Sequence, residues 1–366
     1  MSKLRVAVLF GGRSTEHEIS LLSAQNIIRS LDQNKYEPIL IGIDKTGRWY
    51  YQQDSMQLLH HTDPKQISLT GTTTEVLFSQ NTDDHYLISQ NESESGELYK
   101  VDVLFPVLHG TYGEDGCVQG LARMANIPCV GPGTLGSAVG MDKEVMKRLL
   151  RDANIKSAPW VSIRRRDKDD IDIDHIISQL GTDLFVKPVN LGSSVGITHV
   201  TAPSQLAQAI EFAFEFDHKV IVEKRIFGRE IECAVLGNDD PIASVPGEVI
   251  PKDGFYSYEA KYIDEHGATL KAPADLTDSE IENIKTISIE TFTLLECYGL
   301  ARVDMFLTSE GDVYINEINT LPGFTNISMY PTLWELSGIP QPELIDRLIQ
   351  LALEKHRQDN ELRSEM

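Results

Sequence analysis

Short apolar runs alternate with longer amphipathic stretches along the first third of the chain. Val6–Phe10, Pro38–Ile43 and Val101–Leu108 are predominantly apolar runs of strand length, and the first precedes a helical pattern over Thr15–Leu31. Strands that alternate with helices predict a parallel α/β sheet. The segment between them, Tyr50–Lys100, is rich in Gln, Thr, Ser and Asp, and we expect it to elaborate the first domain.

The pattern changes after Gly131-Pro132-Gly133-Thr134, which is typical of a break between units. Beyond it the spacing predicts helices over Ser137–Arg151, Asp278–Leu295 and Glu343–Lys355, strands over Leu184–Pro188 and Val220–Lys224, a loop over Pro246–Lys271 and a hairpin over Arg302–Asn319.

Length and charge restrict the class of protein. A chain of 366 residues predicts two or three domains, and its formal net charge of -22 argues against nucleic acid or an anionic membrane as a partner. The apolar run near the N-terminus is too short for a signal peptide, and no apolar stretch reaches the ~20 residues of a membrane span. The four cysteines form no CxxC pair, which favours reduced thiols in a cytoplasmic protein.

The hairpin carries an unusual set of polar side chains. If Glu310-Gly311 is its two-residue loop, Asp304 lies opposite Glu317, and Asn319 shares the face of Glu317 because side chains alternate with period two. Arg302 lies two residues before Asp304, so it shares that face as well.

Two carboxylates and an amide oxygen suit Mg²⁺ or Mn²⁺, with water and phosphate oxygens as the remaining ligands. The alternative is a solvated polar face, which is common on hairpins. Ile315 and Phe306 are expected on the same face, so that face is not simply exposed to water, and this favours the metal site.

A phosphate-binding region is predicted upstream. Lys187 ends a strand and precedes the Gly/Ser turn Gly192–Gly196, whose backbone N–H groups are open to an anion. Lys143 in Met141-Asp142-Lys143 lies at the start of a helix, where the dipole also favours anions. The alternatives are an ordinary surface turn and an exposed helix lysine. Backbone groups after Glu223, with the Glu223 and Glu230 side chains, are candidates to bind adenine and ribose.

The ordered motifs resemble those of the ATP-grasp ligases, and more closely those of the D-alanine–D-alanine ligase family. The resemblance implies a Rossmann-like N-terminal domain followed by a two-subdomain ATP-grasp fold, with domains over 1–136 (with an insertion at about 50–100), 137–220 and 221–366. The matching segments are Gly11–Ser20, His109–Gly116, Met141–Lys143, Val186–Pro188, Gly192–Gly196, Glu223–Glu230, Tyr258–Tyr262, Arg302–Asp304 and Asn316–Thr325.

The resemblance also implies a site, residue by residue. It implies ATP as co-substrate, two Mg²⁺ or Mn²⁺ ions, D-alanine as the amino acid substrate and a homodimer. By resemblance, the ATP-binding residues are Lys143, Lys187, Ser194, Glu223, Lys224, Ile226, Glu230 and Asn316, and the metal ligands are Asp304, Glu317 and Asn319. The implied catalytic residues are Glu16, Ser193, Tyr262, Arg302 and Gly323. The residues implied to contact the substrates are His109, Lys261 and Ser328.

Three alternatives remain open. The Gly-rich turn at Gly11 also suits a dinucleotide-binding protein, but Arg13 occupies the third position of the GxGxxG motif, where its second glycine belongs. A non-catalytic ATP-binding module is expected to lack Arg302 or a metal ligand. D-alanyl-D-lactate or D-alanyl-D-serine ligases of the same family differ at Tyr262, which favours the dipeptide product here.

The aromatic segment Gly254–Gly267 is expected to form a lid over the intermediate.

Overall fold

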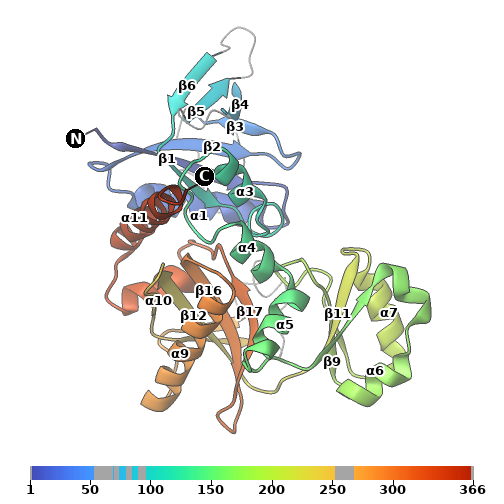
Figure 1. Cartoon of the computed structure of the whole chain (residues 1–366). Coiled ribbons are helices and arrows are strands. Elements are labelled where there is room, and N and C mark those ends of the chain that lie inside the picture. The colour runs from blue at the N-terminus through green and yellow to red at the C-terminus, as the bar shows by residue number, and fades with distance from the viewer. Residues whose placement is uncertain are drawn as a thin grey trace.

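The computed structural model describes residues 2–52, 69, 74–79, 85–89, 96–251 and 268–363. Its strands form three sheets, which follow one another along the chain (Figure 1). The mixed α/β architecture with separate sheets agrees with the fold class that the resemblance implies.

The first sheet has a parallel centre, as predicted. β1 (Leu4–Gly11) lies between β2 (Tyr36–Ile43) and β7 (Val103–Val107) and runs parallel to both. Its alternating side chains are buried on both faces, against α1 (His17–Ser30) on one and α3 (Cys117–Met124) on the other. The sheet is mixed rather than wholly parallel, because antiparallel strands extend it beyond β2: β3 (Trp49–Tyr51), β4 (Thr74–Phe78), β5 (Tyr86–Ser89) and β6 (Gly96–Lys100).

The second sheet is antiparallel and has one covered face. Its order is β10 (Thr198–Val200), β9 (Leu184–Pro188), β11 (Lys219–Lys224) and β8 (Trp160–Arg164), with the 3-10 helix η1 (Arg165–Asp170) after β8. α6 (Ile173–Leu180) and α7 (Pro203–Ala213) pack on the face formed by Leu184 and Val186. By alternation, Phe185 and Lys187 face the opposite side, toward the rest of the molecule.

The third sheet carries the predicted hairpin. β12 (Arg229–Gly237) lies between β16 (Gly299–Leu307) and β14 (Gly247–Pro251), and β17 (Val313–Asn319) forms one edge. The remaining elements are β13 (Ile242–Ala243), β15 (Ala268–Lys271), α9 (Asp278–Leu294) and α10 (Met329–Leu336).

The predicted helix over Ser137–Arg151 is two helices, α4 (Thr134–Met141) and α5 (Lys143–Asp152). Asp142 between them is extended, and its Oδ1 accepts a hydrogen bond from Val145 N at 3.0 Å. An aspartate in this geometry is a helix N-cap, so Lys143 becomes the first residue of a new helix.

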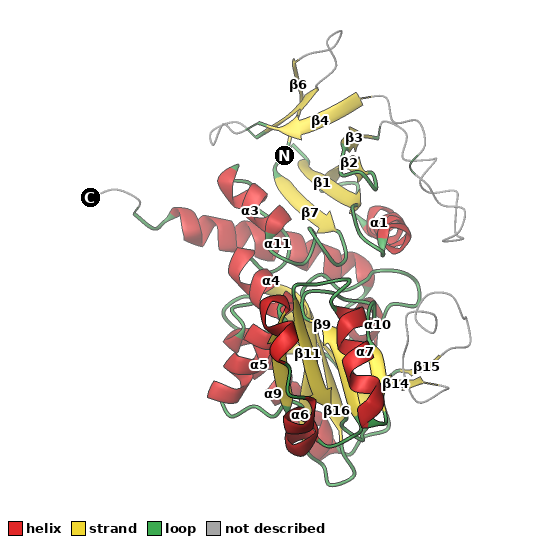
Figure 2. Ribbon diagram, turned by 90° about the vertical axis from the view of Figure 1, so that its right-hand side faces the viewer, coloured by secondary structure: helices red, strands yellow, loops and turns green. Residues whose placement is uncertain are grey.

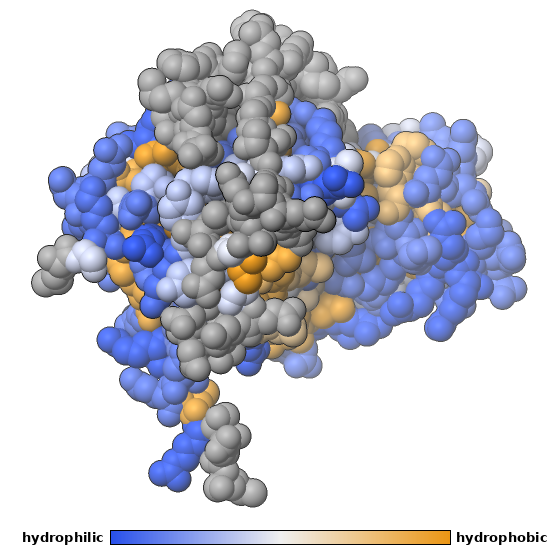
Figure 3. Space-filling view, turned by 90° about the horizontal axis from the view of Figure 1, so that it is seen from above, coloured by the Kyte–Doolittle hydropathy of each residue, from blue (hydrophilic) through white to orange (hydrophobic). Residues whose placement is uncertain are grey.

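The last helix, α11 (Gln341–Asn360), returns to the first sheet (Figures 1 and 2). Leu344, Ile345, Leu348 and Ile349 belong to the same buried core as Val6. The two ends of the chain therefore share one core. No helix in the described ranges is both long enough and apolar enough to cross a membrane. On the face shown in Figure 3, the coloured residues are mostly hydrophilic, in keeping with the high net charge.

Candidate active site

The strand pairing predicted around the metal ligands is confirmed. Asp304 pairs with Glu317 and Arg302 pairs with Asn319 across β16 and β17. Arg302 donates two hydrogen bonds to Asp304, from Nε and Nη2, both at 2.7 Å. Asn319 Nδ2 donates a third to Asp304 Oδ2 at 2.8 Å. The Asp304 carboxylate is therefore held on both oxygens.

The loop of the hairpin differs from the prediction. Thr308 N donates to Asp312 O at 2.9 Å, so three residues, Ser309–Gly311, form the loop and the predicted two-residue loop is wrong. The predicted pairing of Asp304 with Glu317 still holds, because the register between the two strands shifts by one residue between Asp304 and Met305. This shift is a β-bulge, in which one strand carries an extra residue.

The bulge decides which side chains face the site. Met305 pairs with Ile315 rather than Asn316, so Asn316 is the extra residue. Ile315 is buried in the core on the opposite face, and the prediction that it shares the metal face is wrong. Asn316 and Glu317 are both half-buried and take its place beside Asp304.

These side chains have the donor chemistry for a hard divalent cation. Asp304 and Glu317 supply carboxylate oxygens, and their side chains are 14% and 20% exposed. Asn319 presents its amide nitrogen to Asp304, so its amide would have to turn its oxygen outward to act as a ligand. Within the described part of the chain no three His, Cys, Asp or Glu residues form a metal cluster.

Glu232 is a member of the site that the sequence reasoning missed. It lies on β12 opposite Asp304, and its Oε2 is 3.0 Å from Arg302 Nε. Burial opposes the charge of Arg302, but Asp304 and Glu232 hold its pKa well above the ordinary value. The signal was the alternation of Glu230 and Glu232, which puts both carboxylates on the face that carries Arg302.

Both predicted phosphate lysines reach the hairpin. Lys143 Nζ is 3.3 Å from Glu317 Oε2 and donates to Leu191 O at 2.9 Å. Lys187 Nζ donates to Asn316 Oδ1 at 3.5 Å. α5 and the second sheet are thereby connected to the face of the third sheet that carries Glu317 (Figure 1).

A third lysine, Lys147, was also missed. It lies one turn after Lys143 on α5, is fully buried, and its Nζ is 3.2 Å from Glu223 Oε1. Lys187 binds the other oxygen of Glu223 at 2.7 Å. Burial raises the pKa of Glu223, but Lys147 and Lys187 outweigh it and lower that pKa to about 2. The i, i+4 spacing was the only signal for Lys147 in the sequence.

The other predicted nucleotide contacts follow β11. Lys224 is exposed at its end, Ile226 is half-buried in the next loop, and Glu230 is half-buried at the start of β12. The Glu223 carboxylate is bound to the two lysines, and its backbone pairs with Phe185 of β9.

The substrate end of the site lies between two glycine-containing loops. Glu16, before α1, is buried, and a Cβ added to Gly110 or Gly192 would lie 3.2 or 3.7 Å from its Oε2. The loop after β9 is tightly turned there, with left-handed φ angles of 53° at Ser193 and 59° at Ser194. The structure thus brings Glu16 next to the loop of Ser193, as predicted.

His109 joins the first sheet to the loop after β17. Burial lowers its pKa, although nearby Glu16 opposes this, so the ring is neutral near pH 7. Its Nδ1 lies 2.9 Å from Leu321 O and its Nε2 lies 3.3 Å from Ser23 Oγ. Since a carbonyl only accepts, Nδ1 donates to Leu321 and Nε2 accepts from Ser23.

Glu114 makes a second connection between these loops, and it was missed. Its Oε2 accepts from Gly110 N at 2.7 Å and its Oε1 accepts from Leu321 N at 3.1 Å. Burial, helped by nearby Glu16, raises the pKa of Glu114 to about 8. A carboxyl that is largely protonated at neutral pH avoids like-charge repulsion beside Glu16.

The loop after β17 holds the last described substrate candidates. Ser328 Oγ accepts from Thr325 N at 2.9 Å, and a Cβ added to Gly323 would lie 2.9 Å from that oxygen. Gly323 therefore packs directly on Ser328. Lys261, Tyr262 and the predicted lid lie outside the described residues.

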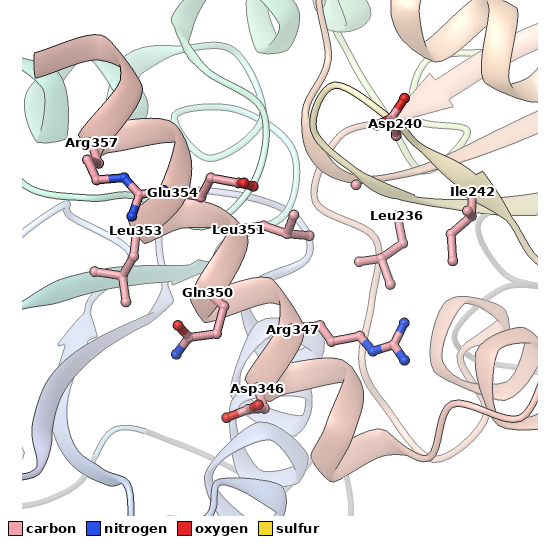
Figure 4. Close-up of a pocket in the computed structure, with 11 residues that line it drawn as sticks. Leu236, Asp240, Ile242, Asp346, Arg347, Gln350, Leu351, Leu353, Glu354 and Arg357 are labelled. Carbon is pink, nitrogen blue, oxygen red and sulfur yellow. The ribbon is translucent and has the colours of Figure 1, made fainter. Parts of the chain in front are cut away.

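A separate pocket of about 670 Å³ lies between α11 and the turn from β12 to β13 (Figure 4). Asp240 and Ile242 border it on one side, and Arg347, Gln350 and Glu354 of α11 on the other. Its lining mixes both charges with apolar groups and includes none of the predicted site residues.

The whole chain has known relatives. Residues 5–132 match the family model described as D-ala D-ala ligase N-terminus, and residues 149–350 match D-ala D-ala ligase C-terminus. A D-alanine–D-alanine ligase of Oceanobacillus iheyensis is 51% identical over 362 residues, covering 99% of this chain and 98% of that protein.

Two solved structures are similar in fold. The D-alanine-D-alanine ligase of Coxiella burnetii has a TM-score of 0.85 at 40% identity and covers 98% of each chain. The VanG D-Ala:D-Ser ligase of Enterococcus faecalis has a TM-score of 0.86 at 37% identity, covering 96% of this chain and 100% of that one.

Proposed function

The chain belongs to the D-alanine–D-alanine ligase family, and from this premise we propose how its residues share the work. It is an ATP-dependent enzyme that joins two D-alanine molecules into D-alanyl-D-alanine for peptidoglycan synthesis. One observation carries the assignment of roles: Lys143 contacts Glu317, which pairs with Asp304 on the hairpin, and Lys187 contacts the adjacent Asn316.

In the first step the carboxylate of one D-alanine attacks the γ-phosphorus of ATP, which forms D-alanyl phosphate and releases ADP. Activation is needed because a free carboxylate has no good leaving group. Such transfer depends mainly on positioning and charge neutralisation. Lys143 and Lys187 bind the phosphates, Glu16 binds the ammonium group of this D-alanine, and His109 lies beside it.

In the second step the amine of another D-alanine attacks the acyl carbon, loses a proton, and the tetrahedral intermediate expels phosphate. Arg302 and the backbone N–H of Gly323 face the developing oxyanion. Ser193 and Tyr262 form a hydrogen-bonded link with Glu16. By their motif positions, Lys261 and Ser328 are assigned to the carboxylate of the second D-alanine.

Asp304, Glu317 and Asn319 would hold two Mg²⁺ or Mn²⁺ ions, which neutralise phosphate charge when bound. Arg302, itself paired with Glu232, holds the Asp304 carboxylate in place for this role. The adenine and ribose are bound by residues of the β11–β12 connection, and the phosphates also contact Ser194 and Asn316. The members of that connection are Glu223, Lys224, Ile226 and Glu230.

We divide the chain into the three units that the motifs imply, with one boundary moved. A boundary at 220–221 would cut β11, whose residues pair with β8 and β9, so the central unit ends in the loop after Lys224. α4 and α5 pack on the third sheet although they precede the second.

We also propose a homodimer. Leu121 and Met124 of α3 and Leu135 of α4 are 40%, 79% and 61% exposed on two contacting helices. An apolar surface suits association of two copies of an acidic chain, because charged surfaces would repel. Light scattering should give a mass of two chains, reduced by Met124→Asp. An unchanged dimer in that variant would place the interface elsewhere.

The function is tested by incubating the purified chain with MgATP and D-alanine. ADP and phosphate should form together with D-alanyl-D-alanine, identified by mass. Faster phosphate release with D-alanine plus D-serine or D-lactate than with D-alanine alone would instead support the alternative products. No ATP turnover with any of these substrates would contradict the proposed roles.

A further inference from the structure

Lys147 is a buried cation that pairs with the Glu223 carboxylate. Its side chain is 0% exposed, and its Nζ lies 3.2 Å from Glu223 Oε1. Burying an ammonium group is costly unless its charge is used. A methionine-like side chain would fill this position of α5 without that cost, so the charge itself needs an explanation.

Glu223 explains the need for a second cation. Its carboxylate is 4% exposed and is shared by Lys147 and by Lys187, which lies at 2.7 Å. Lys187 is also the residue that is proposed to bind the phosphates of ATP. When its charge turns toward a phosphate, Glu223 loses its nearest counter-ion inside a buried site.

We propose that Lys147 is a positioning residue that neutralises the Glu223 carboxylate. Lys187 is then no longer needed as the counter-ion of Glu223 and can bind the phosphates of ATP. The inference rests on the proposed ATP-dependent function. Two lysines and one carboxylate leave a net charge of +1, and that surplus is what a polyphosphate can use. Lys147 does not touch the reacting atoms in this account.

The test compares Lys147→Met, Glu223→Gln and the double variant. In Lys147→Met, binding ATP would strand Glu223 without a counter-ion, so the KM for ATP should rise about 10- to 100-fold. The KM for D-alanine should stay within about twofold. Direct binding of the imido analogue of ATP should weaken in parallel, whereas adenosine, which has no phosphates, should bind about as in the unchanged enzyme.

The double variant separates this account from simple damage to the core. Removing the Glu223 charge removes the need for Lys147, so the double variant should bind ATP about as well as Glu223→Gln alone. A double variant that binds ATP much more weakly than Glu223→Gln would overturn the proposal, because Lys147 would then act on ATP without Glu223. This comparison also holds if Lys147→Met alone fails to fold.

Lys156→Met is the matched control. Lys156 is 52% exposed and pairs with Asp312 on the surface, so its loss should leave the KM for ATP unchanged. Equal losses of affinity for adenosine and for the ATP analogue in Lys147→Met would also contradict the proposal. ATP turnover by the unchanged chain tests the ligase function separately, so the two failures are distinguishable.

Discussion

Arg302→Lys tests whether the guanidinium fork, rather than a positive charge alone, organises the reaction centre. Arg302 makes two 2.7 Å hydrogen bonds to Asp304 and a 3.0 Å contact to Glu232. A lysine keeps the charge but presents a single ammonium, which cannot reproduce a bidentate contact with one carboxylate while facing an oxyanion.

These contacts give an expected loss of turnover and an expected loss of stability. Loss of one preorganised oxyanion donor costs about 3–4 kcal/mol of transition-state stabilisation, so kcat should fall roughly 100- to 1000-fold. Hydrogen bonds to charged groups contribute about 1.5–3 kcal/mol each, and since lysine replaces only part of the set, the unfolding free energy should drop by a similar amount. The enzyme should therefore remain folded while losing most of its turnover.

Phosphate release at saturating ATP and D-alanine gives kcat, and urea unfolding gives stability. Arg347→Lys is the control, because Arg347 also binds a carboxylate through two nitrogens, that of Glu343, but is 45% exposed on α11. This control should leave kcat unchanged, and it should change the free energy of unfolding by no more than about 0.5 kcal/mol. If Arg302→Lys kept kcat within about threefold of the unchanged enzyme, the role given to the fork would be wrong.

Three further outcomes are expected. Asp304→Asn should raise the Mg²⁺ concentration for half-maximal activity by about tenfold or more, since a carboxylate ligand is lost; an unchanged Mg²⁺ titration would argue against Asp304 as a ligand. The pKa of Glu114 is raised from 4.5 to about 8 in the native state. Between these two pH values the native carboxyl holds a proton that the unfolded chain has lost, and its stabilising contribution is lost as pH rises through 8. Urea unfolding of Glu114→Gln should therefore gain stability relative to the unchanged chain between pH 5.5 and pH 8, and a pH-independent difference would contradict this. Glu232→Gln should lower kcat about tenfold by loosening Arg302, and turnover equal to that of the unchanged chain would show that Asp304 alone suffices to hold it.

The sequence predicted the site best where local periodicity governs the structure. Leu184–Pro188 is a strand with the predicted bounds, and Asp304 faces Glu317 as alternation requires. The bulge at Asn316 was not predictable from the hairpin alone. Ile315 N donates to Lys156 O at 2.8 Å, and this tertiary contact belongs to a distant part of the chain.

Other features needed the packed structure. The N-cap at Asp142 had a recognisable residue type, but the apolar spacing continued across it and favoured one helix. Lys147 resembled an ordinary solvated helix lysine, because nothing local indicates that Glu223 lies against it. Glu114 likewise gained its raised pKa only from burial beside Glu16.

The core shared by the two chain ends has a consequence for the order of folding during synthesis. The face of β1 that carries Val6 is completed by Leu344 and Leu348 of α11, which are fully or almost fully buried. Because α1 already covers β1 on this face, the part left to α11 stays uncovered on the ribosome until residues 341–360 have emerged, and exposed apolar surface invites misassembly. The N-terminal unit therefore matures last although it is made first, and a truncation before α11 would leave it without a finished core.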